Sequence, residues 1–494
     1  MSKLSKLRRS ARLRANTSQT LRKTSLGLSL LFAVGALCAP LHGAAAAGPI
    51  VTTKEGPVQG FIQNGVAQFL GIPYATPPVG DLRWRPPQPH APWTAVLKTT
   101  EYAPICALVT TLGVFSGPAN NNEDCLFLNV FTPNLNSSAR LPVIVWIHGG
   151  GNLDGETPGY DGSKLASDGK TVVVSMEYRL NLMGWLAHPA LDNEGHLFGN
   201  YGILDQLLVL NWVRRNIAQF GGDPGNVTLG GQSAGAEDTG IAMVSPLFAG
   251  LFHRGICQSF CPSTFSAGNL PTLASAEATG VAFAVAAGCG AGTDSATAKC
   301  LRSLTAAQVE ALAGTASANS QYVIGPMLDG TVIPEQPLTA FINGHFTHVP
   351  LMNGNTEDEL TFALAITEYF SGPPRVPPTA AQYIDFVKTT YVPPAYLPGT
   401  AAKVLARYPL RAYATPELAW NRVWTDPSIC AERRLDKILA PQIPVYAYEF
   451  DDRRRPTTSR RCRDFFPSPR TPPTSSTCSR SGMADRLRQA SSIL

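Results

Sequence analysis

Short apolar runs alternate with helical patterns along the central part of the chain. Residues 141–147 (Leu-Pro-Val-Ile-Val-Trp-Ile) and 171–175 are rich in β-branched side chains, which favour strands. Apolar residues recur at helical spacing over 203–217, and a further strand pattern follows at 227–229. Strands without polar alternation are typical of parallel sheets that helices cover on both faces. The pattern therefore predicts an α/β fold with a mostly parallel central sheet.

The later part of the chain carries weaker patterns. Residues 274–313 are rich in Ala and predict helix outside their central glycines. Residues 323–333 and 349–353 are interpreted as a further strand region, and 445–450 is strand-like. The sequence contains no internal repeat, so we expect one α/β domain over residues 48–453.

The N-terminal 47 residues have the composition of a secretion signal. Cations lie between Lys3 and Lys23, an apolar stretch covers 26–39, and the small-residue run 43–47 follows. We expect cleavage near Ala47 and a secreted or periplasmic protein. A membrane anchor is the alternative, but the apolar stretch is shorter than the ~20 residues that span a bilayer. No other stretch is long and apolar enough, so we expect no membrane span after signal removal.

Composition and charge narrow the class of protein. The 494 residues are 44% hydrophobic and 15% charged, which is a globular composition. The net charge of +5 comes from the termini: residues 1–47 hold eight Lys and Arg, and residues 454–494 hold nine Arg and two Asp. Without these segments, residues 48–453 carry −10. A mildly acidic body argues against nucleic-acid binding, which needs clustered cations.

Ten cysteines in a chain with an export signal make disulfides plausible. Two local pairs stand out by their spacing: Cys106 with Cys125, and Cys289 with Cys300. Cys257 and Cys261 either pair with each other or are small buried apolar residues. Cys430 has no obvious partner. No Cys or His cluster has the spacing of a zinc site, so we expect no metal and no cofactor.

Candidate chemistry is concentrated at two glycine-rich turns. Gly231-Gln-Ser-Ala-Gly235 fits G-x-S-x-G directly after the predicted strand 227–229, which is the pattern of a nucleophile elbow at Ser233. His148-Gly-Gly-Gly151 follows the predicted strand 141–147, where an α/β hydrolase places backbone N–H donors for an oxyanion. Gly150 and Gly151, with the N–H of Ala234, are the candidate oxyanion hole. A plain tight turn after a strand is the alternative for the second motif.

The order of these motifs resembles the type B carboxylesterase and cholinesterase family of α/β hydrolases. The resemblance runs from Gly48 to about Arg453. Further matching segments are Phe69-Leu-Gly-Ile-Pro-Tyr-Ala75, Leu82-Arg-Trp84, Glu123-Asp-Cys-Leu-Phe-Leu-Asn129, Gly199-Asn-Tyr-Gly202, Asp205-Gln206 and Phe220-Gly-Gly-Asp-Pro224. The resemblance implies a serine esterase acting on a small-molecule ester, with Ser233 as nucleophile. It also implies disulfides within both cysteine pairs.

The family's acid is a Glu in the pattern G-x-x-x-D-E, which Gly354-Asn-Thr-Glu-Asp-Glu359 matches after the predicted strand 349–353. Glu359 is therefore the candidate acid, and Glu357 and Asp358 are the alternatives, expected to be solvated loop charges. The chain departs from the family at Leu360, where Gly is usual, and at Ala236-Glu-Asp238, where small or hydroxyl residues are usual.

The expected catalytic histidine is missing from the printed sequence. A serine hydroxyl needs a base, and the order Ser, Glu, His requires a His after Glu359. The eight His residues are 42, 90, 148, 188, 196, 253, 345 and 348, and all precede Glu359. Two function classes remain open. One is a secreted ester hydrolase, and the other is a catalytically silent, cholinesterase-like binding or adhesion protein.

The composition changes abruptly after Arg453, and residues 454–494 are dominated by Arg, Ser, Thr and Pro. A disordered basic tail is one interpretation. We favour a shifted reading frame: the last base of each codon, read with the first two of the next, allows FPPMPGLLPLAAHTADIQYLFPLWHGG between Thr458 and Asp485. The stretch HTADIQYLF resembles the family's segment around its catalytic histidine. We therefore expect a complete Ser-Glu-His esterase in the parent frame, and a printed chain without the C-terminal part of the fold.

Overall fold

The computed structural model describes residues 48–109, 116–262, 269–313, 325–370, 376–393 and 396–451. The predicted signal (1–47) and the predicted aberrant tail (454–494) lie outside the described residues.

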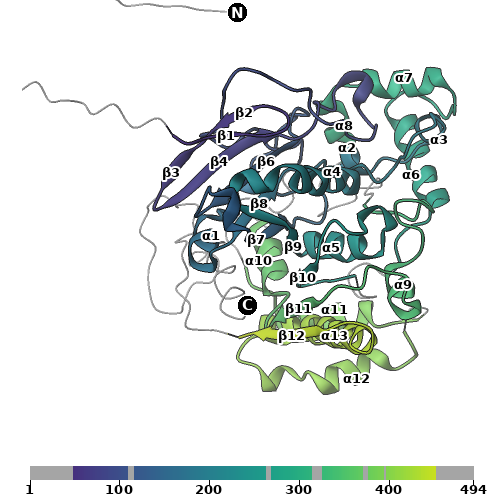
Figure 1. Ribbon diagram of the computed structural model, residues 1–494. Coiled ribbons are helices and arrows are strands. Elements are labelled where there is room, and N and C mark those ends of the chain that lie inside the picture. Colours follow the sequence, from purple (N-terminus) through teal and green to yellow (C-terminus); the bar gives the residue numbers. More distant parts are fainter. Residues whose placement is uncertain are drawn as a thin grey trace, which may run out of the picture. The chain divides into compact units, whose positions relative to one another are not determined.

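A nine-stranded mixed sheet forms the centre of the described structure (Figure 1). In spatial order its strands are β12 (Val445–Phe450), β11 (Leu351–Thr356), β10 (Arg254–Gln258), β9 (Gly222–Gln232), β7 (Leu141–Ile147), β8 (Val172–Met176), β6 (Phe127–Thr132), β4 (Val66–Pro73) and β3 (Phe61–Gln63). The six strands from β12 to β8 are parallel to their neighbours, whereas β8, β6, β4 and β3 pair antiparallel. The prediction of a mostly parallel central sheet is confirmed.

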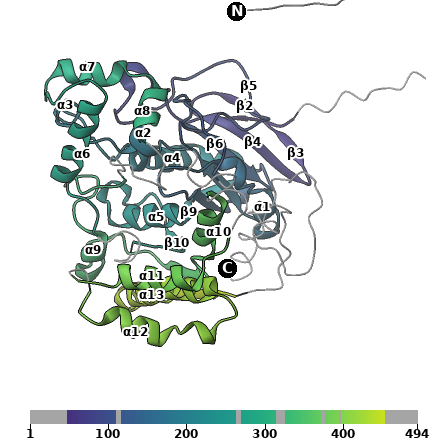
Figure 2. The same cartoon turned by 180° about the vertical axis from the view of Figure 1, so that it is seen from behind.

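A second, three-stranded sheet and the helices complete the described structure. The small sheet contains β1 (Ile50–Thr52), β2 (Pro57–Gln59) and β5 (Leu97–Lys98). The helices are α1 (Ser163–Gly169), α2 (Asn181–Trp185), α3 (Pro189–Asp192), α4 (Tyr201–Asn216), α5 (Ala234–Val244), α6 (Leu273–Ala286), α7 (Ser295–Ser303), α8 (Ala306–Ala313), α9 (Pro337–Asn343), α10 (Thr361–Phe370), α11 (Ala380–Thr390), α12 (Thr400–Arg407) and α13 (Pro416–Leu439). Helices α11, α12 and α13 lie close together in both views (Figures 1 and 2), and Figure 1 shows them beside β11 and β12.

Strand β7 is apolar throughout because both faces of the sheet are covered. Alternate side chains of a strand point to opposite faces. Val143, Val145 and Ile147 belong to the large core that includes residues of α4 and α5. Ile144 and Trp146 belong to a second core, with Leu165 and Ala166 of α1. Helices thus pack on both faces of the sheet, as predicted from the continuous apolar run.

The Ala-rich segment folds as expected, but one predicted strand is wrong. Helices α6, α7 and α8 cover most of 274–313 and are interrupted around Gly288 and Gly290. The described part of 323–333 forms no strand, and its only β-pairing is an isolated bridge between Leu328 and Thr272. This segment is apolar because Met327, Val332 and Ile333 are buried in the large core as a loop.

Both predicted cysteine pairs are disulfides in the structure. Cys106 is bonded to Cys125 with an S–S distance of 2.01 Å, and Cys289 to Cys300 with 2.06 Å. The second bond joins the turn after α6 to α7. Cys257, Cys261 and Cys430 are free thiols, of which only Cys430 is exposed.

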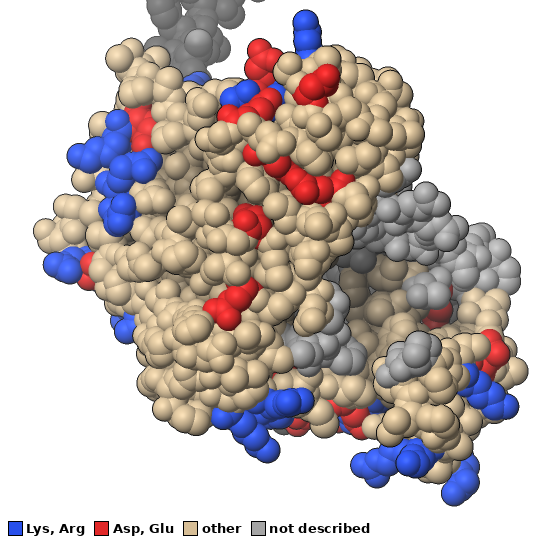
Figure 3. All heavy atoms as spheres, turned by 90° about the vertical axis from the view of Figure 1, so that its right-hand side faces the viewer, with Lys and Arg blue, Asp and Glu red and all other residues tan. Residues whose placement is uncertain are grey.

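The described surface has mixed charge. Figure 3 shows basic and acidic side chains scattered over one face rather than gathered in one stripe. Within the described ranges, no helix is long and apolar enough to cross a membrane, and no group of three or more His, Cys, Asp or Glu could hold a metal ion.

Candidate active site

The candidate site lies where four parallel strands end. Strands β7, β9, β10 and β11 are adjacent, and they end at residues 147, 232, 258 and 356. The segments that follow contain the His148–Gly151 turn, Ser233, Ser259 and Glu359. Ligands of open α/β sheets bind beyond the carboxyl ends of the strands. The topology thus brings the sequence-predicted residues to one edge of the sheet.

Ser233 occupies a strained turn between β9 and α5. Its φ is 56° and its ψ is −124°, a backbone conformation that non-glycine residues rarely adopt. Such strain costs on the order of 1–3 kcal/mol and persists only where the surroundings maintain it. The Ser233 N–H donates to the carbonyl oxygen of Gln258 at 2.9 Å, and the Ser233 carbonyl accepts the N–H groups of Ala236 and Glu237. Hydrogen bonds to β10 and to α5 therefore stabilise the turn.

The two glycines of the elbow are required by close backbone contacts. A Cβ on Gly231 would lie 2.3 Å from the carbonyl oxygen of Gly235, and a Cβ on Gly235 would lie 2.1 Å from that of Ile147. Real Cβ atoms do not approach backbone so closely, so any side chain there would force α5 away from β7 and β9. The spacing of G-x-S-x-G is explained by this packing.

The glycine turn after β7 packs directly against the serine. A Cβ on Gly149 would lie 3.0 Å from Ser233 Cβ. Gly150 has a φ of 124°, and a Cβ there would lie 2.0 Å from the carbonyl oxygen of Asp154. In the described part of the chain, no residue accepts a hydrogen bond from the N–H of Gly150, Gly151 or Ala234. These three donors remain available beside the serine.

Glu359 is the only carboxylate of its segment that faces β10. Its Oε1 accepts hydrogen bonds from Ser259 Oγ at 2.7 Å and from the Thr356 N–H at 2.6 Å. Burial raises the pKa of Glu359, and these hydrogen bonds oppose the shift. The other two carboxylates face α13: Glu357 forms an ion pair with Arg422 at 3.2 Å, and Asp358 accepts from Asn421 Nδ2 at 2.9 Å. Both were expected to be solvated loop charges. Asp358 is exposed as expected, whereas Glu357 is half-buried and ion-paired.

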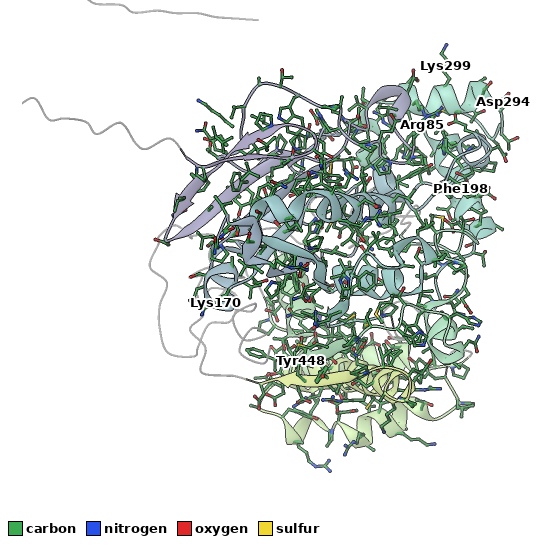
Figure 4. All side chains as sticks on the ribbon, viewed as in Figure 1. Arg85, Lys170, Phe198, Asp294, Lys299 and Tyr448 are labelled. Carbon is green, nitrogen blue, oxygen red and sulfur yellow. A yellow bond between two sulfur atoms is a disulfide. The ribbon has the colours of Figure 1, made fainter. Side chains whose placement is uncertain are left out.

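Ser259 was missed by the sequence analysis. It follows β10, has a φ of 57°, and its N–H donates to the carbonyl oxygen of Gly354 in β11. It therefore connects the strand next to the elbow with the acid. The only sequence signal was its place at the end of a strand. Tyr448 of β12, labelled in Figure 4, is in register with Gly354 of β11. Burial raises the pKa of Tyr448, and the charge of Glu359 raises it further.

Two carboxyls, half-buried Glu237 and fully buried Asp238, follow the elbow on α5, at positions that depart from the family pattern. Asp238 accepts from Gln206 Nε2 at 2.6 Å and from Asn152 Nδ2 at 3.1 Å. Burial raises the pKa of Asp238 to about 8 and that of Glu237 to about 7. Asp238 thereby links α5 to Asn152, which follows the glycine turn. The sequence did not predict this contact.

No described histidine forms a hydrogen bond with Ser233 or Glu359. His148 lies behind the glycine turn, where its ring stacks on Tyr178 at 4.5 Å and its Nδ1 is 2.9 Å from the Gly149 carbonyl oxygen. Burial lowers the pKa of His148 to about 4. Two further histidines have partners elsewhere: His253 Nδ1 accepts from the Val227 N–H, and His188 Nδ1 from the Ala190 N–H.

A strained serine after a parallel strand, backed by a glycine turn from the neighbouring strand, is the arrangement of α/β hydrolases. Within that class, a model of the carboxylesterase family matches residues 47–479, and the chain belongs to the carboxylesterase family.

Individual relatives agree with this assignment. The chain is 40% identical over 316 residues to fumonisin B1 esterase of Sphingopyxis macrogoltabida, covering 62% of this chain and 55% of the relative. It is 36% identical over 369 residues to mouse carboxylesterase 1F, covering 68% and 64%. The structure of the Geobacillus stearothermophilus carboxylesterase EST55 aligns with a TM-score of 0.65 at 30% identity, covering 81% of this chain and 79% of that chain. The chain thus spans 55% and 64% of the lengths of the two curated relatives.

Proposed function

We propose that this protein is a carboxylic ester hydrolase that works through an acyl-enzyme on Ser233. The observation that carries the proposal is the positive-φ backbone of Ser233 between two glycines at which any side chain would press on neighbouring backbone. Strain of this kind is concentrated at functional sites, because folding alone does not favour it. Here it places a hydroxyl at the end of a buried strand, beside the glycine turn.

Ser233 attacks the ester carbonyl, and negative charge develops on the carbonyl oxygen. The N–H groups of Gly150, Gly151 and Ala234 are the donors for this oxyanion. Support for this role comes from their lack of protein acceptors in the described residues, since an occupied donor could not bind the oxyanion. The alcohol then leaves, and water hydrolyses the acyl-enzyme.

Glu359 is the acid that orients the base and stabilises its imidazolium form. This role requires an ionised carboxylate. Donation by Ser259 Oγ and the Thr356 N–H stabilises the ionised form against burial, which favours the neutral one. Ser259 is thus a positioning residue for the acid.

The general base is a histidine that is encoded in the alternative reading frame of the tail, residues 454–494. The printed sequence holds no His after Glu359, and the described histidines have other partners. The alternative frame of residues 458–485 supplies one within a segment similar to the family's. The printed chain is accordingly a very slow hydrolase, and a silent binding protein is the second candidate for that chain alone. Residues 1–47 are a secretion signal in this proposal, which N-terminal sequencing of exported protein tests.

The esterase proposal is tested with p-nitrophenyl esters of increasing acyl length. The protein is expressed from a gene with a single base inserted at the Arg453 codon, which restores the proposed reading frame. Hydrolysis should depend on Ser233, and Gly151→Val should lower the rate by about 10²–10³ if the turn holds the oxyanion. Gly159→Val is the matched control, because a Cβ there, as at Gly151, has nothing within 4 Å, whereas of the two only Gly151 has a positive φ, of 67°. Hydrolysis that survives Ser233→Ala would exclude the nucleophile, and unchanged rates in Gly151→Val would exclude the oxyanion turn.

A further inference from the structure

Two buried thiols flank the turn that carries Ser259. Cys257 is in β10, in register with Gly231 of β9 and Asn353 of β11. Cys261 follows four residues later, after Ser259 and Phe260, whose φ values of 57° and 75° reverse the chain. Both sulfurs are free and fully buried.

Both thiols reach the same point on α5. Cys257 Sγ donates to the carbonyl oxygen of Ala236 at 3.4 Å. A Cβ on Gly240 would lie 3.4 Å from Cys261 Sγ. In an α-helix the carbonyl oxygen of residue 236 accepts the N–H of residue 240. The Cys257 contact with Ala236 and the Cys261 contact with Gly240 are therefore one helical turn apart, on adjacent backbone groups of α5. Burial raises the pKa of Cys261, and a hydrogen bond with the Cys257 side chain is the next largest cause.

We propose that Cys257 and Cys261 form a third disulfide, and that this turn is a site of oxidation by a disulfide-bearing partner. The reaction balances as an exchange. Two Sγ–H bonds and one S–S bond of the partner break, Sγ–Sγ of the turn forms, and both protons and two electrons pass to the two thiols that the partner becomes.

Burial determines when this exchange occurs. The attacking species is a thiolate, and a buried thiol with a raised pKa is a poor source of it. Oxidation is therefore fast while the chain folds and slow once α5 covers the turn. Each redox form, once folded, persists.

The effect of this disulfide on the candidate active site rests on the function proposed above. The turn contacts the nucleophile through the Gln258 carbonyl, which accepts the Ser233 N–H, and the acid through Ser259 Oγ. A covalent bond from 257 to 261 encloses both contacts in one closed loop. The disulfide would thus fix the nucleophile and the acid relative to each other.

Peptide mapping tests the pairing without any measurement of activity. The full chain is refolded with oxidised glutathione until Cys106 and Cys125 are fully linked, then denatured, alkylated without reduction and cleaved with chymotrypsin. Phe260 lies between the two cysteines, so cleavage after it leaves two peptides that only a disulfide can hold together. The control variant Cys257→Ser should leave Cys261 alkylated.

We expect linked peptides with neither Cys257 nor Cys261 alkylated, while exposed Cys430 is alkylated. Protein folded under reducing conditions should then react with oxidised glutathione at Cys257 and Cys261 at least about 100-fold more slowly than at Cys430. Alkylation of both cysteines in protein whose Cys106–Cys125 bond is complete would overturn the proposal. Pairing of either one with another cysteine would do the same.

Discussion

The buried carboxyl of Asp238 should make the stability of this protein depend on pH, and Asp238→Asn should remove that part of the dependence. Burial, opposed by the hydrogen bonds from Gln206 and Asn152 and assisted by the charge of Glu237, raises its pKa from 3.8 to about 8. Because the folded-state pKa lies above the unfolded one, the folded chain holds this proton more tightly than the unfolded chain does.

The magnitude follows from linkage. Stability from Asp238 is fully present below about pH 4, falls by about 1.4 kcal/mol per pH unit, and is lost as the pH rises through about 8. Between pH 5 and pH 8 the wild-type protein should therefore lose roughly 3–4 kcal/mol more than the variant. The amide has the same shape, and in the described structure Asn152 Oδ1 and Gln206 Oε1 are both buried without a partner and could accept from it.

The assay is urea unfolding at pH 5, 6, 7 and 8, followed by tryptophan fluorescence. Other buried carboxyls with raised pKa values, such as Glu177 and Glu310, shift stability in the same direction in both proteins and cancel in the difference. Asp81→Asn, at an exposed position, is the control for loss of one charge. Parallel pH profiles for wild type and Asp238→Asn would refute the reasoning.

Three further predictions concern the elbow, a disulfide and the acid. Gly235→Ala should lower the free energy of unfolding by about 1–3 kcal/mol through overpacking against Ile147, whereas Gly159→Ala should be neutral or slightly stabilising; equal urea midpoints would contradict this. Replacing Cys106 and Cys125 by Ala should cost about 3 kcal/mol, because their loop of 19 residues is no longer closed in the unfolded chain, and thermal unfolding with and without reductant measures it. Ser259→Ala should raise the pKa of Glu359 further, since it removes a donor to the ionised form, so the acidic limb of the frame-restored enzyme's pH–rate profile should move to higher pH; an unmoved limb would count against the contact.

The sheet and the elbow could be predicted because their signals are local. Strand β7 is buried on both faces and reads as one apolar run, and the glycines at 231 and 235 are adjacent in sequence to the serine that they accommodate. The segment 325–333 was wrongly predicted as a strand because its local apolar pattern is also that of a strand. Its apolar residues are buried as a loop, in which Asp329 Oδ1 accepts the N–H groups of Thr331, Val332 and Ile333.

Contacts between distant residues left no such signal. Ser259 and Glu359 are 100 residues apart, and Asn152 and Asp238 are 86 apart. Nothing in the pattern around either Ser259 or Asp238 specifies the partner, because the sheet order that brings them together is a property of the whole fold. The departure from the family at Asp238 was visible, but its partners were not.

The roles of Ser233 and the missing histidine are tested most directly by measuring Ser233→Ala in two backgrounds, the printed sequence and the frame-restored gene, with p-nitrophenyl acetate as substrate. A serine and its base act as a unit, so losing either costs about as much as losing both. Ser233→Ala should lower kcat by on the order of 10⁵–10⁶ in the restored frame and should change the slow rate of the printed chain little. An equally large loss in the printed chain would mean that it already contains the base, and no loss in the restored frame would mean that Ser233 is not the nucleophile.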